Sequence, residues 1–352
     1  MTSRGRRAFA VLLVVGLAGC REVASTDLGP IWHSGGAEIR AGGWLTWSAD
    51  GGTVFWVGPD EQHMTMALLS MRMASGAVMR SLPDIFDFPA PQVANDDRTI
   101  FFTKADANSD SSNAVISLRA PLTGGLAGEP VELARDVFRY LASPDGRRVV
   151  VERYDSSVSS IDVATGAQVA LGKDFEPTSF SPDGTRVLMR NEAANDPSEH
   201  YVLIDPVAGG AQNVAFPNND SISVVLRWDG NRPRVVVGYR PSAIDLVSGD
   251  IVTFGFDALA ATDGDPAAAQ HAYGWTSDCI DQGRNPETGD AVCGGYQLRL
   301  FRSDVTTGVT DLVGAAADVE PSIAVSRDGR RLAALTSPHG DLHVEVLPAA
   351  LR

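Results

Sequence analysis

Short apolar runs follow one another along most of the chain, separated by turns rich in glycine, aspartate and proline. The runs contain many β-branched and aromatic residues, as in TSF and TRVLM on the two sides of residues 181–184. Residues of these types favour short strands. The pattern therefore predicts an all-β protein.

The letters Ser-Pro-Asp-Gly occur at 143–146 and again at 181–184, each time between two apolar runs. Proline presets the backbone for a type I turn, aspartate bonds its own backbone, and glycine adopts the left-handed conformation. Each stretch therefore predicts a β-hairpin. Related Asp-Gly hairpins are expected at 47–57 and 325–335, with weaker copies starting at Val93, Arg227 and Ala261.

A second signature lies downstream of these hairpins, where an apolar strand ends in aspartate and glycine follows four positions later. It occurs at Asp162 and Gly166, Asp205 and Gly209, Asp245 and Gly249, and Asp304 and Gly308, and without the aspartate at 72–76 and 120–124. The two series together give about seven units of roughly 34 to 65 residues. Repeated units of four short strands favour a β-propeller.

The ends of the chain predict how the ring closes. The last unit supplies three strands, and residues 37–42 resemble the strand that precedes other repeats. We therefore expect one propeller of seven four-stranded blades over residues 30–352, with an N-terminal strand completing the last blade. This closure would cover an exposed sheet edge. An open β-sandwich and a pair of smaller propellers remain alternatives.

The repeats resemble the SPDG-type, WD40-like blades of TolB-like β-propellers, and the resemblance covers nearly all of the chain after Gly29. It implies the fold and says little about function. TolB carries an α/β domain before its propeller and docks a peptidoglycan-associated lipoprotein. This chain has no room for such a domain, so TolB's partner and role are not carried over.

The first nineteen residues have the pattern of an export signal. Arg4, Arg6 and Arg7 precede an apolar run over 8–19, which is too short to span a membrane that requires about 20 residues. Leu17-Ala18-Gly19-Cys20 resembles the bacterial lipobox, which implies a diacylglycerol on the Cys20 thiol. The alternative is a plain signal peptide in which Cys20 is incidental.

A lipidated Cys20 would hold the protein at a membrane, because several acyl chains make anchoring stable. Residues 20–29 then form a short tether. Arg21 stands where an aspartate would retain an enterobacterial lipoprotein in the inner membrane, which favours the outer membrane. The formal net charge of −15 makes nucleic acid a poor partner. We expect a monomer.

Two further cysteines, Cys279 and Cys293, bracket a loop rich in glycine, asparagine and proline. In an oxidising compartment such a pair predicts a disulfide, since a metal site would need more ligands nearby. Trp275, beside this loop, is a candidate platform for a ligand. Other tryptophans, Trp44, Trp47 and Trp228, are predicted to pack between blades.

Candidate metal chemistry is confined to one acidic stretch. Asp106, Asn108 and Asp110 place oxygen side chains at alternate positions, which is compatible with calcium, although the turn glycine and late glutamate of a calcium loop are missing. An ordinary solvated loop has the same composition. Apart from this possible calcium ion, no cofactor is expected.

No catalytic motif identifies an enzyme in this sequence. It contains no Gly-x-Ser-x-Gly elbow, metalloprotease motif, P-loop or dinucleotide fingerprint, and its six histidines are scattered. We therefore expect a non-catalytic, membrane-anchored envelope lipoprotein whose propeller binds a protein or glycan. The alternative is a hydrolase or lyase whose site is assembled from several blades at the central channel.

Overall fold

The computed structural model of the protein describes residues 45–60, 65–75, 77–85, 91–105, 115–123, 125–193, 201–214, 222–229, 232–237, 242–245, 250–262, 269–284, 288, 291–315, 322–336 and 341–346. These residues form strands and turns. None of the described segments is a helix long and apolar enough to cross a membrane.

The described strands form a series of antiparallel sheets, each built from consecutive strands. The first blade contains β1 (Leu45–Trp47), β2 (Thr53–Asp60), β3 (Thr65–Arg72) and β4 (Ala77–Pro83). The second contains β5 (Gln92–Val93), β6 (Thr99–Ala105), β7 (Val115–Thr123), β8 (Leu126–Ala127) and β9 (Val131–Ala134). The third contains β10 (Val137–Ala142), β11 (Arg148–Arg153), β12 (Ser157–Asp162) and β13 (Gln168–Lys173).

The second half of the chain continues the same order. The fourth blade contains β14 (Phe175–Phe180), β15 (Val187–Asn191), β16 (Tyr201–Ile204) and β17 (Ala211–Val214). The fifth contains β18 (Ile222–Asp229), β19 (Arg232–Val237), β20 (Ser242–Asp245) and β21 (Ile251–Thr253). The sixth contains β22 (Ala258–Thr262), β23 (His271–Arg284), β24 (Ala291–Asp304) and β25 (Thr310–Ala315), and a last sheet contains β26 (Ser322–Val325), β27 (Arg331–Thr336) and β28 (Asp341–Val346).

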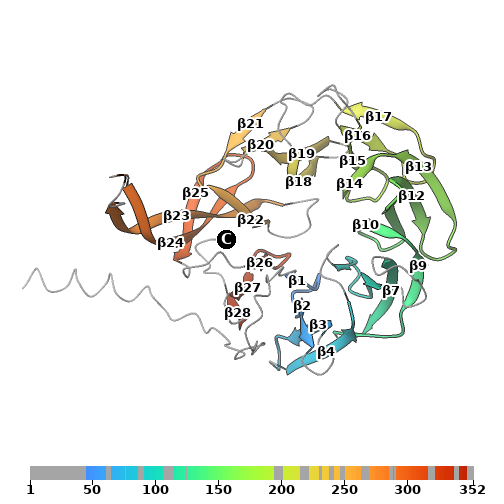
Figure 1. Cartoon of the computed structure of the whole chain (residues 1–352), viewed down its shortest axis with the longest axis horizontal. Helices are drawn as coiled ribbons and strands as arrows, with labels where there is room; N and C mark the ends of the chain where they lie inside the picture. Colours follow the sequence, from blue (N-terminus) through green and yellow to red (C-terminus); the bar gives the residue numbers. More distant parts are fainter. Residues whose placement is uncertain are drawn as a thin grey trace, which may run out of the picture.

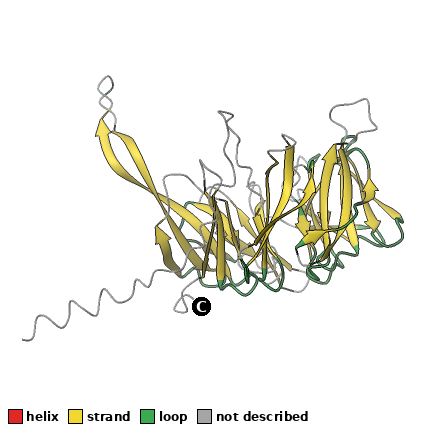
Figure 2. Cartoon of the chain, turned by 90° about the horizontal axis from the view of Figure 1, so that it is seen from below, coloured by secondary structure: helices red, strands yellow, loops and turns green. Residues whose placement is uncertain are grey.

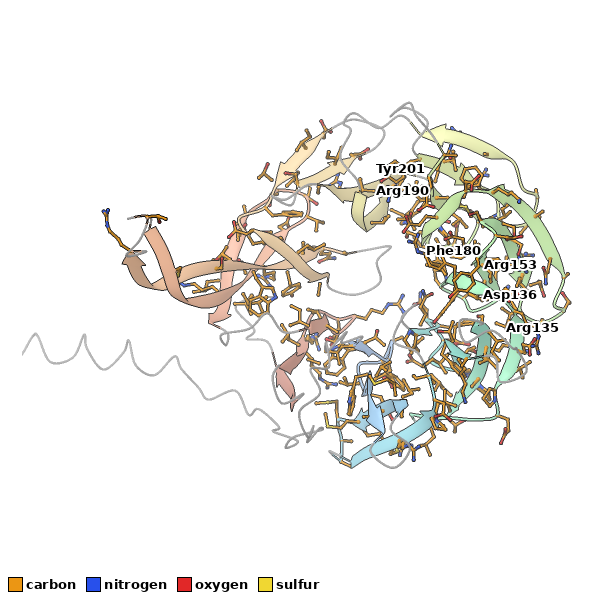
Figure 3. The ribbon with its side chains drawn as sticks, in the orientation of Figure 1. Arg135, Asp136, Arg153, Phe180, Arg190 and Tyr201 are labelled. Carbon is orange, nitrogen blue, oxygen red and sulfur yellow. The ribbon has the colours of Figure 1, made fainter. Side chains whose placement is uncertain are left out.

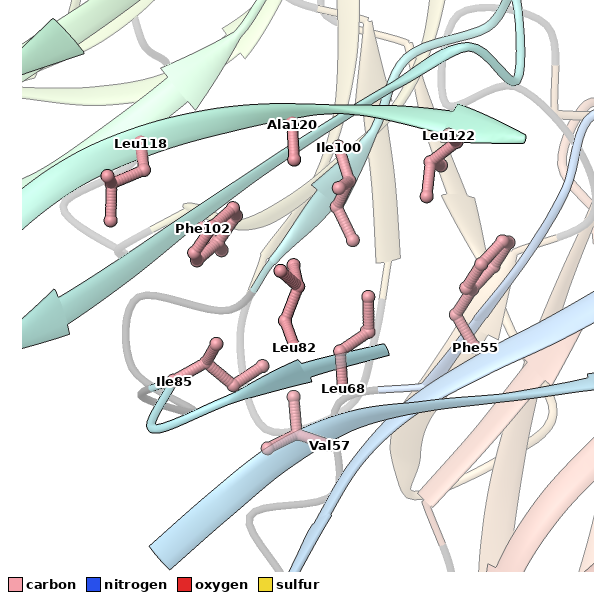
Figure 4. Close-up of a cluster of buried hydrophobic side chains, with 10 residues drawn as sticks. All are labelled: Phe55, Val57, Leu68, Leu82, Ile85, Ile100, Phe102, Leu118, Ala120 and Leu122. Carbon is pink, nitrogen blue, oxygen red and sulfur yellow. The ribbon is translucent and has the colours of Figure 1, made fainter. Parts of the chain in front are cut away.

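The sheets surround one axis, with the first strand of each blade nearest to it (Figure 1). This arrangement confirms the predicted β-propeller. Apolar clusters lie between neighbouring blades. In one of them, Phe55 and Leu68 of the first blade pack against Ile100 and Phe102 of the second (Figure 4). Trp47 and Trp228 lie in two other clusters between sheets, as the sequence predicts.

The prediction of seven four-stranded blades is not confirmed. Six sheets of the described residues have four or more strands, and the last sheet has three. Residues 37–42, which were expected to supply its fourth strand, lie outside the described part of the chain. The described part of the chain therefore contains six blades of four or more strands and one three-stranded sheet.

Contacts between the last sheet and the first blade close the ring. The indole Nε1 of Trp47 donates a hydrogen bond to the Ala324 carbonyl at 3.1 Å. Arg331 donates another to the Gly51 carbonyl. Ala333 packs in the same apolar cluster as Trp47. The three-stranded sheet thus occupies the position of a blade between the sixth and the first (Figure 1).

The ends of the described strands define two faces of the ring. First strands end and second strands begin at one face, which we call the turn face. Second strands end and third strands begin at the other, the loop face. The β23–β24 hairpin, whose strands each have 14 residues, projects from the loop face (Figure 2).

Repeated side-chain contacts build the turn face. Ser181 donates a hydrogen bond to Asp183 Oδ1 at 2.7 Å, and the same contact recurs in the equivalent turns, including Ser143 to Asp145. Gly184 adopts a φ of 68°, so a residue without Cβ is favoured there. These contacts confirm the turn chemistry expected of the Ser-x-Asp-Gly stretches.

Arginine and aspartate pair across strands on the turn face. Arg148, at the start of β11, lies 3.6 Å from Asp162, at the end of β12, and opposite it in register. Arg234 and Asp245 form the equivalent pair at 3.8 Å in the fifth blade. Each arginine also donates to a backbone carbonyl of the next blade, Arg148 to Pro206 and Arg234 to Val305. The aspartate signature of the sequence thus joins strands within a blade, while its arginine partner joins blades.

Candidate functional site

A group of charged side chains lies where the inner strands of the third and fourth blades begin. We call Arg139, Glu152, Glu176, Arg190 and Glu192 the axial carboxylate cluster. Arg139 is on β10 and pairs in register with Glu152 on β11, while Glu176 is on β14 and pairs with Arg190 on β15. All five are remote from the Ser-x-Asp-Gly turns, so the cluster belongs to the loop face. Figure 3 labels Arg190 and, in the neighbouring third blade, Asp136.

Two aspartates with left-handed backbones precede the inner strands and set the position of the cluster. Asp136 has a φ of 57° and Asp174 a φ of 59°, a conformation that aspartate tolerates better than most residues. Their carbonyls accept hydrogen bonds from the N–H groups of Tyr154 and Glu192, at 3.1 and 2.8 Å. Tyr154 and Glu192 therefore occupy equivalent positions in the two blades, beside the start of the inner strand.

One nitrogen of Arg139 lies close to three carboxylates. Arg139 Nη1 is 2.7 Å from Glu176 Oε1, 3.7 Å from Glu192 Oε1 and 3.8 Å from Glu152 Oε2. The contacts are ionic and lack hydrogen-bond geometry, because Arg139 Nη1 and Glu152 Oε2 are both buried without a hydrogen-bond partner. Such atoms are expensive to bury and point to a ligand or water in the working protein.

Glu152 is the most buried carboxylate of the cluster, with a relative exposure of 3%. Burial raises the pKa of its carboxyl to about 7, and the nearby Glu192 and Glu176 act in the same direction against the opposing charge of Arg139. A carboxyl group with this pKa exchanges its proton near neutral pH. This property is typical of a general acid or base.

An aromatic pair lies next to the charged groups. Phe138 is the extra residue at a bulge of β10, between Val137 and Arg139. Its ring lies 4.8 Å from the Arg139 guanidinium carbon and 5.5 Å from the ring of Tyr154. Tyr154 is 54% exposed. Bulges often redirect side chains beside functional sites, and here the bulge presents an aromatic surface beside carboxylates.

The donor arrangement of the cluster does not fit a resident metal ion. Among the described residues, no group of three or more histidine, cysteine, aspartate or glutamate side chains is arranged to hold a metal. In the axial carboxylate cluster, the guanidinium of Arg139 takes the position between carboxylates that a cation would need.

The site residues predicted from the sequence lie elsewhere or outside the described residues. Cys20 and the calcium candidates Asp106, Asn108 and Asp110 belong to undescribed segments. Cys293 forms a disulfide. Cys279 lies on the neighbouring strand, opposite Tyr296, and its bond to Cys293 remains a prediction.

Trp275 is placed differently from the expectation. Its side chain is 4% exposed and packs with Tyr273 and Leu300 against Ile323 and Val325 of the last sheet. A buried indole cannot present its face to an external ligand. The position is that of a residue packing between sheets, and the expected ligand platform is corrected accordingly.

No motif in the sequence predicts the axial carboxylate cluster. Four of its members lie on four strands of two blades and Glu192 follows β15, so they form no contiguous motif. One signal was available, because Glu152 directly follows the apolar run Val149–Val151 in the interior of a predicted strand. A charged residue at such a position is unusual unless it is paired or functional.

Comparison with known proteins identifies the fold. No protein-family model matches the chain. No curated protein matches it either. Among solved structures, an oligogalacturonate lyase from Vibrio parahaemolyticus has a TM-score of 0.63 at 10% identity, covering 95% of this chain and 96% of that one.

Two further structures have similar architecture. An oligogalacturonate lyase in complex with manganese has a TM-score of 0.59 at 12% identity, covering 87% of this chain and 89% of the other. Kuenenia stuttgartiensis hydrazine synthase has a TM-score of 0.54 at 14% identity, covering 90% and 99%. At these identities the likeness establishes a β-propeller fold, and the function of this chain has to be argued from its own residues.

Proposed function

We propose that the protein is a propeller enzyme, a hydrolase or lyase acting on a glycan at the axial carboxylate cluster. The observation that carries the proposal is the buried Glu152 carboxyl, whose pKa is raised to about 7 beside one guanidinium and further carboxylates. This reverses the sequence-based expectation of a non-catalytic scaffold. The similarity to oligogalacturonate lyases supports an enzyme at the level of the fold.

The cluster contains the groups that cleavage of a glycosidic bond requires. In hydrolysis, a protonated carboxyl donates a proton to the leaving oxygen while a second carboxylate acts as base or nucleophile. In elimination, a carboxylate removes a carbon-bound proton and an acid protonates the leaving oxygen. Glu152 is suited to be the acid, Glu176 or Glu192 the second carboxylate, and Arg139 the group that stabilises developing negative charge.

Activity assays on the purified protein test the proposal. A panel of neutral, cationic and anionic polysaccharides is incubated with the protein, and new reducing ends and unsaturated products are measured separately. Glu152→Gln should reduce turnover by about 100-fold or more, the usual contribution of a general acid. Glu132→Gln is the matched control, because Glu132 is an exposed residue of the second blade paired with Arg135. Equal activity in the two variants, or none on any substrate, would contradict an enzyme at this cluster.

We also propose that the chain is exported and anchored through Cys20, with residues 37–42 completing a seventh blade. The lipobox at 17–20 and the disulfide at Cys293 support an oxidising envelope compartment. Under this proposal a role as a non-catalytic envelope binding module remains a second candidate. The β23–β24 ribbon favours it, because beyond Trp275 and before Arg299 these strands pair only with each other among the described residues.

Fractionation tests the anchor. Wild-type protein should partition into detergent-soluble membranes, whereas Cys20→Ser should be released into the soluble fraction. Retention of Cys20→Ser at the membrane would contradict lipidation at this residue. Crosslinking of the anchored form then tests the binding module, which predicts a stoichiometric partner lost when the β23–β24 ribbon is shortened.

A further inference from the structure

The charges of the axial carboxylate cluster restrict what it can bind. The carboxyl groups of Glu152, Glu176, Glu192 and nearby Asp174 outnumber the guanidinium groups of Arg139 and Arg190. The chain as a whole carries a formal charge of −15. An anionic sugar would therefore approach like charges, which is unfavourable both at the site and at longer range.

The two arginines are already engaged by carboxylates. Arg139 contacts three of them, and Arg190 Nη1 donates to Glu176 Oε2 at 3.4 Å. The charge of each guanidinium is therefore partly offset by carboxylates of the cluster, which weakens its attraction for a sugar carboxylate. Glu192, in contrast, is 41% exposed at its side chain and lies 3.7 Å from its nearest guanidinium nitrogen, so it can accept a cationic group from solution.

A second observation points to a ligand at the same place. Glu152 is 3% exposed, and its Oε2 has no hydrogen-bond partner although it faces the other charged groups. The exposed ring of Tyr154, in contact with Phe138, extends the site with an aromatic surface. Aromatic faces attract cations and also pack against the C–H faces of sugars.

We propose that the axial carboxylate cluster recognises a sugar unit bearing a free amine, with the ammonium group at Glu192 and the sugar ring against Tyr154. This inference rests on the proposed function, since it assigns the substrate class of the same site. It differs from the substrate named for the similar lyase structures, because a galacturonate unit carries the opposite charge.

Calorimetric titration with short oligosaccharides tests the inference without requiring turnover. Tetrasaccharides of glucosamine, of N-acetylglucosamine and of galacturonic acid are compared. The glucosamine form should bind at least about tenfold more tightly than the N-acetylated form, corresponding to one charge-assisted contact. Both Glu192→Gln and Tyr154→Ala should weaken its binding by about fivefold to tenfold.

The control variants separate specific binding from general attraction to an acidic protein. Glu132→Gln removes a carboxylate away from the cluster and should leave the affinity unchanged. Equal affinity in wild type, Glu192→Gln and Tyr154→Ala, or tighter binding of the galacturonate oligomer, would overturn the inference. Circular dichroism shows whether each variant is folded.

The outcomes for substrate class and for catalysis are distinguishable. Binding of the amine-bearing oligomer without cleavage would support the inference and contradict the enzyme. Cleavage of a neutral or anionic glycan without preference for the amine would do the reverse.

Discussion

The carboxyl group of Glu152 combines burial, an ion pair with Arg139 and an oxygen that lacks a hydrogen-bond partner. Burial disfavours its ionised form, so folding holds the proton more tightly than the unfolded chain does. The folded pKa of about 7 lies above the unfolded value of 4.5. Its contribution to stability is therefore fully present below pH 4.5 and is lost as the pH rises through about 7.

Glu152→Gln should for this reason stabilise the protein at alkaline pH. At pH 8 we expect the free energy of unfolding to rise by on the order of 2 kcal/mol, since glutamine keeps the shape without the buried charge. At pH 4.5 the two proteins should be nearly equal. Urea denaturation at both pH values measures this difference. A variant that is destabilised equally at both pH values would show that Glu152 is not the titrating group.

The second carboxylate of the cluster provides a separate prediction. Glu176 contacts both Arg139 and Arg190, so Glu176→Gln removes the partner of two guanidinium groups. We expect a loss of about 1 to 2 kcal/mol in the free energy of unfolding at pH 7, because partly buried cations lose their counter-charge. Denaturation at high salt is the check, and the loss should shrink there if it is electrostatic. A loss that does not depend on salt would indicate a packing defect.

Individual residues were predictable only where the local pattern determines their role. The turn glycines and the inter-blade tryptophans Trp47 and Trp228 follow from conformation and apolar area, and the structure agrees. Glu152 and Glu176 lie on different blades, and no local rule brings them together. The prediction for Trp275 was wrong because its position beside a loop in the sequence does not show that the last sheet covers its side chain.

At the scale of the strand pair, the chain shows an internal correspondence. Blades whose third strand ends in aspartate have a basic residue opposite it, as for Arg148 and Asp162, Arg234 and Asp245, and His271 and Asp304. The first two blades lack the aspartate and have Thr53 and Thr99 at the start of the second strand. In these five blades the aspartate and the basic residue opposite it are therefore present or absent together, whereas in the last sheet Arg331 lies opposite Val346. This correspondence could have been predicted from the repeats.

Two adjacent arginines allow the contribution of the Arg148–Asp162 pair to stability to be tested. Arg148→Ala should reduce the free energy of unfolding by about 1 to 2 kcal/mol, because the side chain contacts Asp162, Ser160 and the Pro206 carbonyl. Arg147→Ala is the control, since its side chain is 84% exposed and should contribute little. Chemical denaturation of both variants measures the difference. Equal stability of the two variants would mean that the pair across β11 and β12 adds nothing.

Across the whole molecule, the turn-face aspartates predict sensitivity to acid. Hydrogen bonds lower the pKa values of these carboxyls, from Ser48 to Asp50, from Ser181 to Asp183, and from the N–H groups of Thr165 and Ala208 to Asp162 and Asp205. A depressed folded pKa gives stability that is present above the unfolded value of 3.8 and lost as the pH falls through the folded pKa. The melting temperature should therefore decline steeply below about pH 4. A Tm unchanged from pH 5 to pH 3 would contradict this, and calorimetry measures it.

The closing contact of the ring gives the last prediction. Arg331→Ala should lower the free energy of unfolding by about 1 kcal/mol, because Arg331 donates to the Gly51 carbonyl of the first blade. Arg330→Ala is the matched control, as its side chain is 59% exposed. The two variants are compared by denaturation and limited proteolysis. Faster cleavage in both the first and last sheets of Arg331→Ala is expected, and cleavage confined to the last sheet would contradict coupling through this contact.

Ring closure also determines when the first blade can be completed during synthesis of the chain. Trp47 and Ala324 are hydrogen-bonded across 277 positions of sequence, so the first blade is synthesised long before its neighbour exists. Until residues 322–336 have emerged, the apolar cluster of Trp47, Val54 and Met71 lacks the side chain of Ala333 that completes it. Such an exposed surface is prone to aggregation while the chain is incomplete. A truncation near the C-terminus should therefore destabilise the first blade as well as the last sheet.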